Sequence, residues 1–363
     1  MRRITMLVFT VLFAIIGLSS SIVAQDEEIE PWVCPEGFEG QSLSVYNWST
    51  YIGENTISDF EELCGVTVTY DVYDSNESLV ARLRQGNPGF DVAVPNDYVI
   101  PVMVRENLIQ PIDVAQIPNF ANVAEEFRGL AFDPENEYTV PYLWGTTGVA
   151  YNTEYVGEAI TSWEQVFNYD GPVAWVDDAR VMLGIALLML GYDMSTTDPD
   201  QIEEAKNYLI ENGDNVFAFA QDDGEVLLET GEVDIAIEYG GDIFQLITNC
   251  ECETYAYVIP DEGSIGDIAN LVLLTDAPNP ELAVVFMDYI LHPQVGADIT
   301  NYTFYPSPNG VALERGLIEE ELLTNPAITP DEEARQRLTY FNDVGESEEL
   351  YINAWEEVKI ALR

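Results

Sequence analysis

Residues 43–94 read LSVYNWSTYIGENTISDFEELCGVTVTYDVYDSNESLVARLRQGNPGFDVAV, and the spacing of their apolar side chains predicts three strands. Apolar residues run together at 43–46 and at 90–94, and they alternate with other residues at 66–72. Short continuous or alternating apolar runs are typical of buried and half-buried strands. We therefore expect this stretch to contribute three strands to one sheet.

Helices are expected in the two intervals between these strands. The first opens at Thr56 and stops at Gly65, and the second is capped by Ser75 and ends at Gly86. Serine and threonine are favoured at helix starts, and glycine commonly ends a helix because it adopts positive φ at no steric cost. The alternation of strand and helix indicates an α/β protein with a mainly parallel sheet covered by helices on both faces.

The middle of the chain repeats this alternation. Strands are expected at 173–176 and 233–237, and an apolar helix ends at Gly191. Two further helices open at Asp198 and Asn279, each followed by a proline at the favoured first helical position. Two α/β units without a long linker between them predict two lobes with a cleft between them.

Polar and aromatic side chains cluster where the predicted strands end. The clusters lie at 47–51, at 96–98, at Asp178 and at 239–242. In open α/β sheets, ligands bind beyond the carboxyl ends of the strands. Aromatic rings and carboxylates together suit an organic cation, since ring faces attract ammonium groups and carboxylates pair with them. Taken singly, the rings are also compatible with packing, and Asp178 with helix capping.

The charge of the chain is strongly negative. Its 363 residues include 65 Asp and Glu but only 13 Lys and Arg, which gives a formal net charge of −52. Such a surface repels phosphate backbones and anionic lipid, so we exclude nucleic acid as a partner. It attracts cationic ligands, and it also keeps exported proteins soluble in salty media.

The single histidine, His292, excludes several classes of site. A Ser-His-Asp triad, a Cys-His dyad or a multi-histidine metal site would each have to use it. His292 precedes Pro293 at an expected helix end, where interaction with the last carbonyl groups is the favoured interpretation. We expect neither catalytic residues, nor a bound metal, nor a cofactor.

The N-terminus has the pattern of a secretory signal peptide. Arg2 and Arg3 precede an apolar run from 6 to 18, and Ala24 supplies the small residue expected before cleavage. We therefore expect a cleaved signal peptide at 1–24, an acidic leader at 25–41 and an exported mature protein. Residues 1–24 contain two bases and no acids, so the mature chain has a formal charge of −54.

Export permits disulfides among Cys34, Cys64, Cys250 and Cys252. Cys34 precedes the first strand and Cys64 ends the first helix, so a bridge between them fits the predicted elements. A bridge within Cys250-Glu251-Cys252 would close a small ring, and the three pairings stay open from sequence. Zinc is the weaker interpretation, because neither pair has C-x-x-C spacing.

Several strings of residues occur in order from about residue 42 to the end of the chain. They are Asn47-Trp48-Ser49-Thr50-Tyr51-Ile52, Tyr70-Asp71-Val72-Tyr73-Asp74-Ser75-Asn76-Glu77, Phe90 to Pro95, Phe132-Asp133-Pro134, Pro141 to Gly148, Asp177-Asp178-Ala179-Arg180, Gly231-Glu232-Val233, Tyr305 to Asn309 and Asn342 to Gly345. Together they resemble the spermidine/putrescine-binding proteins of bacterial ABC importers. Any one short string alone would be a weak match.

That resemblance implies a type II periplasmic-binding-protein fold with two α/β lobes, a hinge and a ligand cleft between the lobes. One lobe would hold 42–144 plus 270–312, and the other 145–269 plus 313–363. Ligand would close the lobes about crossing strands near 144–152. The closed protein, expected as a monomer in the periplasm or outside a single membrane, would deliver a polyamine to a membrane permease.

The resemblance also carries site residues over, position by position. The matching positions are aromatic, polar or acidic: Trp48, Ser49, Tyr51, Asn96, Tyr98, Asp178, Tyr239, Asp242 and Tyr305. Tyr239 stands where the family has a tryptophan, and Asn96 where a serine is usual. Asp242 matches an acid of the putrescine-binding branch.

Four further positions depart from the family pattern. The glutamate expected one helical turn after Asp178 is Val181, and a glutamine position is occupied by Phe341. An expected aspartate falls on Ala269, and its flanking aromatic on Asp267. Since a buried ammonium without a partner is costly, a polyamine would require another carboxylate to take over. Asp267, Asp242 and Glu238 are the candidates, and Asp267 would reach the site after a shift of one or two residues.

We therefore expect a solute-binding protein that captures a polyamine. The alternative keeps the fold and the transport function for an amino-acid-like or less charged solute, which the changes at Val181, Ala269 and Phe341 favour. An exported hydrolase with paired carboxylates, and ferric-ion capture by tyrosines, lack supporting motifs.

Overall fold

The computed structural model describes residues 29–250, 254–325, 328–330 and 332–363. The predicted signal peptide at 1–24 and Cys252 lie outside the described residues. The chain divides into two units, residues 1–31 and residues 32–363, and the fold belongs to the second. A search of the described residues finds no helix long and apolar enough to cross a membrane.

One mixed sheet runs through the second unit. Its strands are β1 (Ser42–Trp48), β2 (Thr67–Tyr73), β3 (Val92–Ala93), β4 (Thr139–Asn152), β5 (Val173–Val176), β6 (Val216–Ala220), β7 (Ile235–Tyr239), β8 (Tyr255–Val258), β9 (Ser264–Leu273) and β10 (Leu338–Thr339). They are ordered β2-β1-β3-β9-β4-β7-β5-β6, with β8 paired to β4 and β10 to β9.

Helices surround this sheet. They are α1 (Thr56–Cys64), α2 (Asn76–Arg84), α3 (Ile100–Arg105), α4 (Thr153–Val156), α5 (Trp163–Phe167), α6 (Ala179–Leu190), α7 (Pro199–Glu211), α8 (Gly224–Thr230), α9 (Gly240–Cys250), α10 (Pro280–Ile290), α11 (Pro293–Thr303), α12 (Gly310–Glu314), α13 (Glu320–Thr324), α14 (Glu332–Arg335) and α15 (Glu348–Ala361). Short 3-10 turns include η1 (Asp97–Val99) and η5 (Gly345–Ser347).

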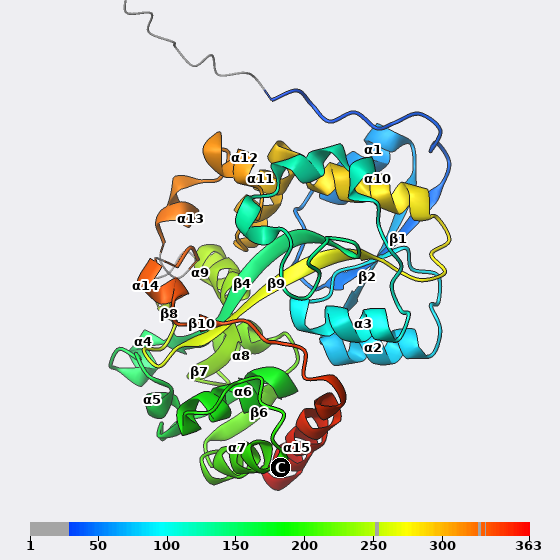
Figure 1. Cartoon of the computed structure of the whole chain (residues 1–363). Helices are drawn as coiled ribbons and strands as arrows, with labels where there is room; N and C mark the ends of the chain where they lie inside the picture. The colour runs from blue at the N-terminus through cyan, green and yellow to red at the C-terminus, as the bar shows by residue number, and fades with distance from the viewer. Residues whose placement is uncertain (1–28, 251–253, 326–327, 331) are drawn as a thin grey trace, which may run out of the picture. The chain divides into compact units, whose positions relative to one another are not determined.

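Two parallel half-sheets are joined by two antiparallel strands. β1 pairs in parallel with β2 and β3, and β5 pairs in parallel with β6 and β7. β9 pairs with β3 at one end, β4 pairs with β7 at the other, and β4 and β9 pair with each other between them. Figure 1 shows β4 and β9 side by side as they cross between the two groups of helices. The predicted α/β fold with two lobes and crossing strands is confirmed.

Local signals explain where most of the helices begin and end. α1 and α6 end at Gly65 and Gly191, which adopt φ values of 67° and 78°. The Ser75 side chain accepts a hydrogen bond from the Ser78 amide at the start of α2, as predicted. Thr56 is the first residue of α1 rather than its cap.

The predicted strands differ from the observed ones mainly at their ends. β3 is limited to 92–93 instead of 90–94, and β7 covers 235–239 instead of 233–237. The Asp234 amide donates to the carbonyl of Pro172, so the chain already lies beside the start of β5 one residue before β7 begins. β2 lies at the edge of the sheet, and its Val72 is 53% exposed.

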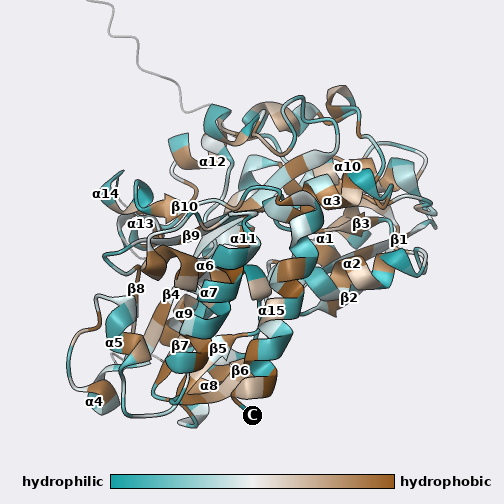
Figure 2. Ribbon diagram, turned by 60° about the horizontal axis from the view of Figure 1, so that its bottom comes forward, coloured by the Kyte–Doolittle hydropathy of each residue, from teal (hydrophilic) through white to brown (hydrophobic). Residues whose placement is uncertain are grey.

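The apolar core lies around the strands and the inner helices. Trp163, Trp175 and the apolar face of α6 are fully buried. Figure 2 shows hydrophobic residues along β5, β6 and β7, and hydrophilic residues along the outer helices α7 and α15. This distribution holds the parallel strands between helix layers, so the loops after their carboxyl ends are free to form a site.

The segment before β1 is anchored to the first lobe. A disulfide joins Cys34 to Cys64, which confirms that predicted pair. The Trp32 indole N–H donates to Asp288 at 2.9 Å, and its ring lies 5.0 Å from that of Tyr289. His292 is buried between α10 and α11, and its amide donates to the Tyr289 carbonyl at 3.0 Å.

Candidate functional site

Loops from the two half-sheets meet beside the crossing strands. They follow β1, β3, β6 and β7, and they enclose a cavity of about 20 Å³ together with β9 and the segment after α11. Its lining residues are Trp48, Ser49, Tyr51, Asn96, Asp222, Tyr239, Asp242, Asp267 and Tyr305. All of them except Asp222 are residues that the sequence predicts for the site. A cavity of this volume holds about one water molecule.

Two predicted residues lie behind this lining. The Tyr98 hydroxyl donates to Asp178 Oδ2 at 3.4 Å and accepts from Asn76 Nδ2 at 3.1 Å. Asp178 also caps α6, since its Oδ1 accepts from the Val181 amide at 2.8 Å. The structure therefore places Tyr98 and Asp178 in a second layer, and the capping alternative for Asp178 is confirmed.

The aromatic walls of the cavity are held in fixed orientations. The Tyr51 ring stands nearly perpendicular to that of Tyr305 at a centroid distance of 4.5 Å. The Trp48 ring lies 6.4 Å from that of Tyr239, and the Trp48 indole N–H donates to the Val94 carbonyl at 2.9 Å. These ring pairs and the indole hydrogen bond fix the orientations of the aromatic walls.

Two glycines make room for Tyr305. A Cβ atom on Gly241 would lie 2.1 Å from the Tyr305 ring, and one on Gly145 would lie 3.2 Å from it. Any other residue at 241 would displace the ring, because non-bonded heavy atoms do not approach so closely. The Gly240-Gly241 pair after β7 is thus a sequence signal for close approach of another segment.

The carboxylates in the lining accept hydrogen bonds from the opposite lobe. Asp242 accepts from Thr50 Oγ1 at 2.6 Å and from the Tyr305 hydroxyl at 2.5 Å. Asp222 accepts from Ser49 Oγ at 2.6 Å. The bonds from Ser49 and Thr50 connect the loop after β1 with the loops after β6 and β7.

Asp267 is reached from the loop after β3. Its Oδ1 accepts from Asn96 Nδ2 at 3.1 Å. Asp267 pairs with Gly145 across the two crossing strands, and Ala269 pairs with Leu143. Since alternate residues of a strand share a face, Asp267 and Ala269 point to the same side of β9. Asp267 therefore lines the cavity from β9, with Ala269 two residues farther along the same face of the strand.

Burial raises the pKa of each lining carboxylate. The pKa of Asp267 is raised to about 7, first by burial and then by Asp178. Burial raises the pKa of Asp222 well above its usual range, and Asp242 adds to this shift. The pKa of Asp242 is also raised by burial, against the hydrogen bonds from Thr50 and Tyr305 that lower it. No lysine, arginine or histidine is found among the described lining residues.

One group of carboxylates is close enough to hold a metal ion. Oxygen atoms of Asp222, Glu238 and Asp242 lie within 4.8 Å of one another, and the search covered the described residues. Glu238 already accepts from the amides of Gly224 at 2.9 Å and Tyr239 at 2.8 Å. Because both of its oxygens serve the backbone, Glu238 braces the loop after β6, and it does not line the cavity.

The sequence prediction missed the lining residue Asp222 and Thr50, which donates to the lining residue Asp242. Asp222 follows β6, a half-exposed strand that we did not predict, so the strand-end rule was not applied there. Thr50 was treated as a spacer between Ser49 and Tyr51, yet its hydroxyl reaches Asp242. Its φ of 49° is unusual for a β-branched residue, and this type of strain is concentrated at functional sites.

Comparison with known proteins agrees with this fold. Residues 55–330 match the model of the bacterial extracellular solute-binding protein family. The spermidine/putrescine-binding periplasmic protein of Escherichia coli strain K12 is 32% identical over 325 residues, which cover 88% of this chain and 92% of that protein. The putrescine-binding periplasmic protein SpuD of Pseudomonas aeruginosa strain UCBPP-PA14 is 31% identical over 341 residues, with the same two coverages.

A solved structure extends the comparison to three dimensions. The putative spermidine/putrescine ABC transporter protein from Listeria monocytogenes superposes with a TM-score of 0.83 at 31% identity. The match covers 88% of this chain and 99% of that one. With the matched family model and these relatives, the chain belongs to the bacterial extracellular solute-binding proteins.

Proposed function

We propose that this protein captures a polyamine of the putrescine or spermidine type between its lobes and delivers it to the permease of an ABC importer. The observation that carries the proposal is the lining of the cavity. Asp222, Asp242 and Asp267 are held together without a basic side chain in the lining, beside the rings of Tyr51, Tyr239 and Tyr305. The names of the similar proteins from E. coli and P. aeruginosa support the same class of ligand.

The energetics of the carboxylates favour a cationic ligand. Each lining acid has its pKa raised by burial, so each is costly to keep ionised without a partner. An ammonium group between the carboxylates would relieve the repulsion among them and donate charge-assisted hydrogen bonds to them. The methylene chain of a polyamine would pack on the aromatic walls, where the ring faces also attract the cation.

We propose the lobe boundaries that the sequence suggests, 42–144 plus 270–312 and 145–269 plus 313–363. The pairing of β3 with the end of β9 at 272–273, and of β7 with the second half of β4, supports them. Closure would then bend β4 and β9 where they pass from one half-sheet to the other. The hydrogen bonds of Ser49 and Thr50 to Asp222 and Asp242 would be made at the end of that motion.

We further propose that residues 1–24 are removed on export and that the protein acts as a monomer outside the cytoplasmic membrane. The membership in an extracellular family supports this location. The protein would bind and release its ligand unchanged, without metal or cofactor.

The experiment is calorimetric titration of the mature protein after unfolding and refolding, which strips bound solute. Putrescine, cadaverine, spermidine and spermine are titrated at low and high salt, beside neutral and zwitterionic amino acids. Saturable one-to-one binding of a polyamine that persists at high salt supports the proposal. Weak heats at many sites that disappear with salt would show only attraction by the −54 surface, and would contradict it.

A second candidate is a solute with fewer charges. Val181, Ala269 and Phe341 stand where the family resemblance predicts two acids and a glutamine, and Phe341 packs at 5.8 Å from the Tyr98 ring. These three positions therefore carry apolar side chains where the resemblance predicts polar ones. Tighter binding of a monoamine or an amino-acid-like solute than of any diamine in the same titration would favour this candidate.

A further inference from the structure

Arg180 is a buried cation close to the cleft that does not line the cavity. It lies in the first turn of α6, two residues after Asp178, and its side chain has no exposed surface. Arginine is almost never fully buried unless its charge is paired. The contacts of this guanidinium therefore show what it holds in place.

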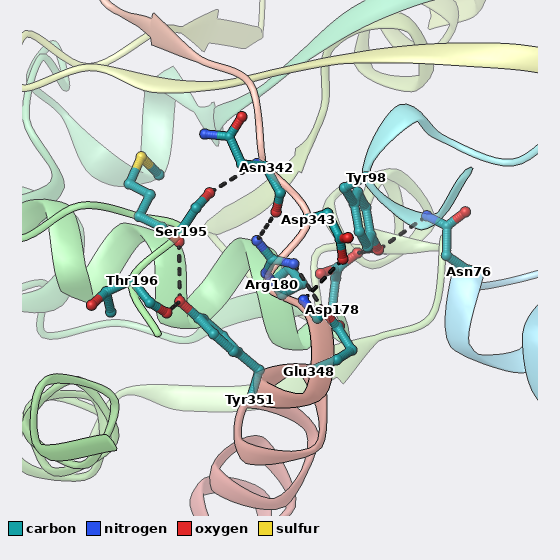
Figure 3. A network of polar contacts seen from close by, with 12 residues as sticks. Asn76, Tyr98, Asp178, Arg180, Ser195, Thr196, Asn342, Asp343, Glu348 and Tyr351 are labelled. Atoms are coloured by element: carbon teal, nitrogen blue, oxygen red, sulfur yellow. Dashed lines mark hydrogen bonds and ion pairs between the residues drawn. The ribbon is translucent and has the colours of Figure 1, made fainter. Parts of the chain in front are cut away.

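Two polar contacts tie Arg180 to the C-terminal segment (Figure 3). Nη1 pairs with Glu348 Oε2 at 2.9 Å, and Nη2 donates to the Asn342 carbonyl at 3.2 Å. Glu348 begins α15, while Asn342 belongs to the stretch that leads from β10 to this helix. The charge of Arg180 thus fixes the start of α15 against the start of α6.

Three aromatic rings surround the same guanidinium. Its Cζ lies 4.8 Å from the ring centre of Phe341, 4.7 Å from that of Tyr351 and 5.4 Å from that of Tyr98. Phe341 and Tyr351 come from the C-terminal segment, whereas Tyr98 belongs to η1 in the loop after β3. Tyr98 is therefore the ring that enters from the other lobe, and it meets Phe341 edge to face at 5.8 Å.

The segment around Asn342 lies within the second proposed lobe and links it to the first through a side-chain contact. Its upstream end, β10, pairs with β9, and the Asn342 amide donates to Ser195 Oγ at 2.9 Å. The next residue, Asp343, forms an ion pair with Arg105 of α3. Arg180 lies where this link, the helix that carries Asp178 and the ring of Tyr98 come together (Figure 3).

We propose that Arg180 is a positioning residue for the closed cleft, an inference that rests on the proposed function. Through its ring contacts and its pair with Glu348, it forms the socket into which Tyr98 docks when the lobes close. Asp178 and Phe341 lie beside this socket, and they are thereby held in fixed positions relative to Tyr98. Arg180 therefore slows ligand release without touching the ligand.

A purely structural function for Arg180 is the alternative to be tested. Replacing a buried ion pair by apolar residues of similar size often leaves stability unchanged or raises it. An apolar residue cannot replace the attraction between the planar guanidinium and the Tyr98 ring. It also lacks the hydrogen bonds that the guanidinium donates in a fixed geometry. Positioning therefore predicts an effect on ligand release even where stability is unchanged.

The test compares Arg180→Met/Glu348→Gln with the wild-type protein. Both charges are removed together, so neither is left buried and unpaired. We expect the rate of putrescine release, measured by stopped-flow competition, to rise about tenfold with little change in the association rate. The matched control is Arg84→Met/Glu106→Gln, which removes a bidentate pair on the surface of the first lobe and should leave release unchanged.

A double-mutant cycle with Tyr98→Leu separates positioning from packing. If Arg180 acts through Tyr98, the two effects on release are not additive, and Tyr98→Leu adds little in the Arg180→Met/Glu348→Gln background. Additive effects, or a changed free energy of unfolding with an unchanged release rate, would overturn the inference.

Lobe closure is also measured without relying on ligand binding. Nitroxide labels at exposed Glu281 and Glu211, on α10 and α7, report the distance between lobes by double electron–electron resonance. We expect the ligand-free Arg180→Met/Glu348→Gln variant to populate longer distances than the ligand-free wild type. Identical distributions would count against Arg180, whereas a wild-type protein that binds no polyamine would count against the proposed function alone.

Discussion

The cleft has an end at Asp222, Asp242 and Asp267 and another at Asp178. The negative charge of the carboxylates is compensated differently at these two ends. Asp222, Asp242 and Asp267 receive hydrogen bonds from Ser49, Thr50, Tyr305 and Asn96, but no basic side chain lines this end in the described structure. At the other end, Asp178 directly precedes the first turn of α6, which holds Arg180, and it caps this helix by accepting a hydrogen bond from the Val181 amide. Within the described ranges, the first end thus has only neutral hydrogen-bond donors, whereas the second end has a cation from the protein itself, Arg180.

This difference indicates where the charge of a ligand matters most. Around Asp242 the missing cation has to come from the ligand. Around Asp178 a guanidinium is already present, and the neighbouring Glu77 has its pKa raised to about 8 by burial and by Asp178, which favours its protonated form at neutral pH. We therefore expect removal of a carboxylate to weaken binding far more at the first end than at the second.

The largest effect is expected from Asp242→Asn. This variant keeps the shape of the side chain but removes the charge that would pair with an ammonium group. We expect the Kd for putrescine or spermidine to rise about 100-fold, which corresponds to about 2.7 kcal/mol. Isothermal titration of the refolded variant measures it.

Asp59→Asn is the matched control for this experiment. Asp59 is exposed on α1, and its replacement changes the net charge by the same amount. An equal loss of affinity in both variants would show that the acidic surface as a whole, and not Asp242, attracts the ligand.

A smaller effect is expected from Asp178→Asn. Asparagine retains the capping function, and Arg180 still interacts with Glu348 and Asn342, so α6 keeps its start. We expect the Kd to rise about tenfold and the melting temperature to stay the same, as measured by titration and by calorimetric unfolding. A loss as large as that of Asp242→Asn would break the proposed difference between the two ends.

The helices and strands of this protein were predictable wherever a local signal marks their ends. Gly65, Gly191 and the Asp198-Pro199 pair each act within one helical turn, and the structure confirms all three. β6 was missed because its sequence, VFAFA, lies at the edge of the sheet and is only half buried. Its position is determined by pairing with β5, a tertiary contact that single-sequence patterns do not contain.

The site shows the same limit. Trp48, Tyr51 and Asp242 were predictable because each follows a strand that ends at the cleft. The place of Asp267 depends on the register of β9 against β4, which sets Asp267 opposite Gly145. Arg180 was visible only as part of a matching string, because its partners Tyr98, Phe341 and Glu348 are far away in sequence.

The pH dependence should distinguish the acidic end from the rest of the protein. The pKa of Asp267 is about 7 in the folded protein and lies near 3.8 without these surroundings. Between these values the folded chain binds more protons than the unfolded chain, so this carboxyl lowers the free energy of unfolding as pH rises toward 7. Binding of an ammonium group has the opposite trend, since it needs the ionised form.

We therefore expect the Kd of a polyamine to rise about fourfold from pH 8 to pH 6.5, while the ligand-free protein becomes more stable. Titration and denaturant unfolding at each pH measure the two trends. Asp267→Asn should flatten both of them. If this variant keeps the pH dependence of binding, another carboxyl of the acidic end is responsible.

The smallest effect is expected at Thr50, which joins the two lobes at the acidic end. Its hydroxyl donates to Asp242, and its φ of 49° places a β-branched residue in the left-handed region, at a cost of the order of 1 kcal/mol. Thr50→Ser keeps the donor and removes the branch, whereas Thr50→Ala removes both the donor and the branch, so the two variants differ only in the hydroxyl. We expect Thr50→Ser to bind like the wild type and Thr50→Ala to bind about threefold more weakly, because a neutral donor to a carboxylate contributes little beside the charge of the ligand. If both variants bind like the wild type, the strained loop after β1 serves packing alone. The charge of the ligand would then be enough to bring the two lobes together at the acidic end, without the hydrogen bond from Thr50.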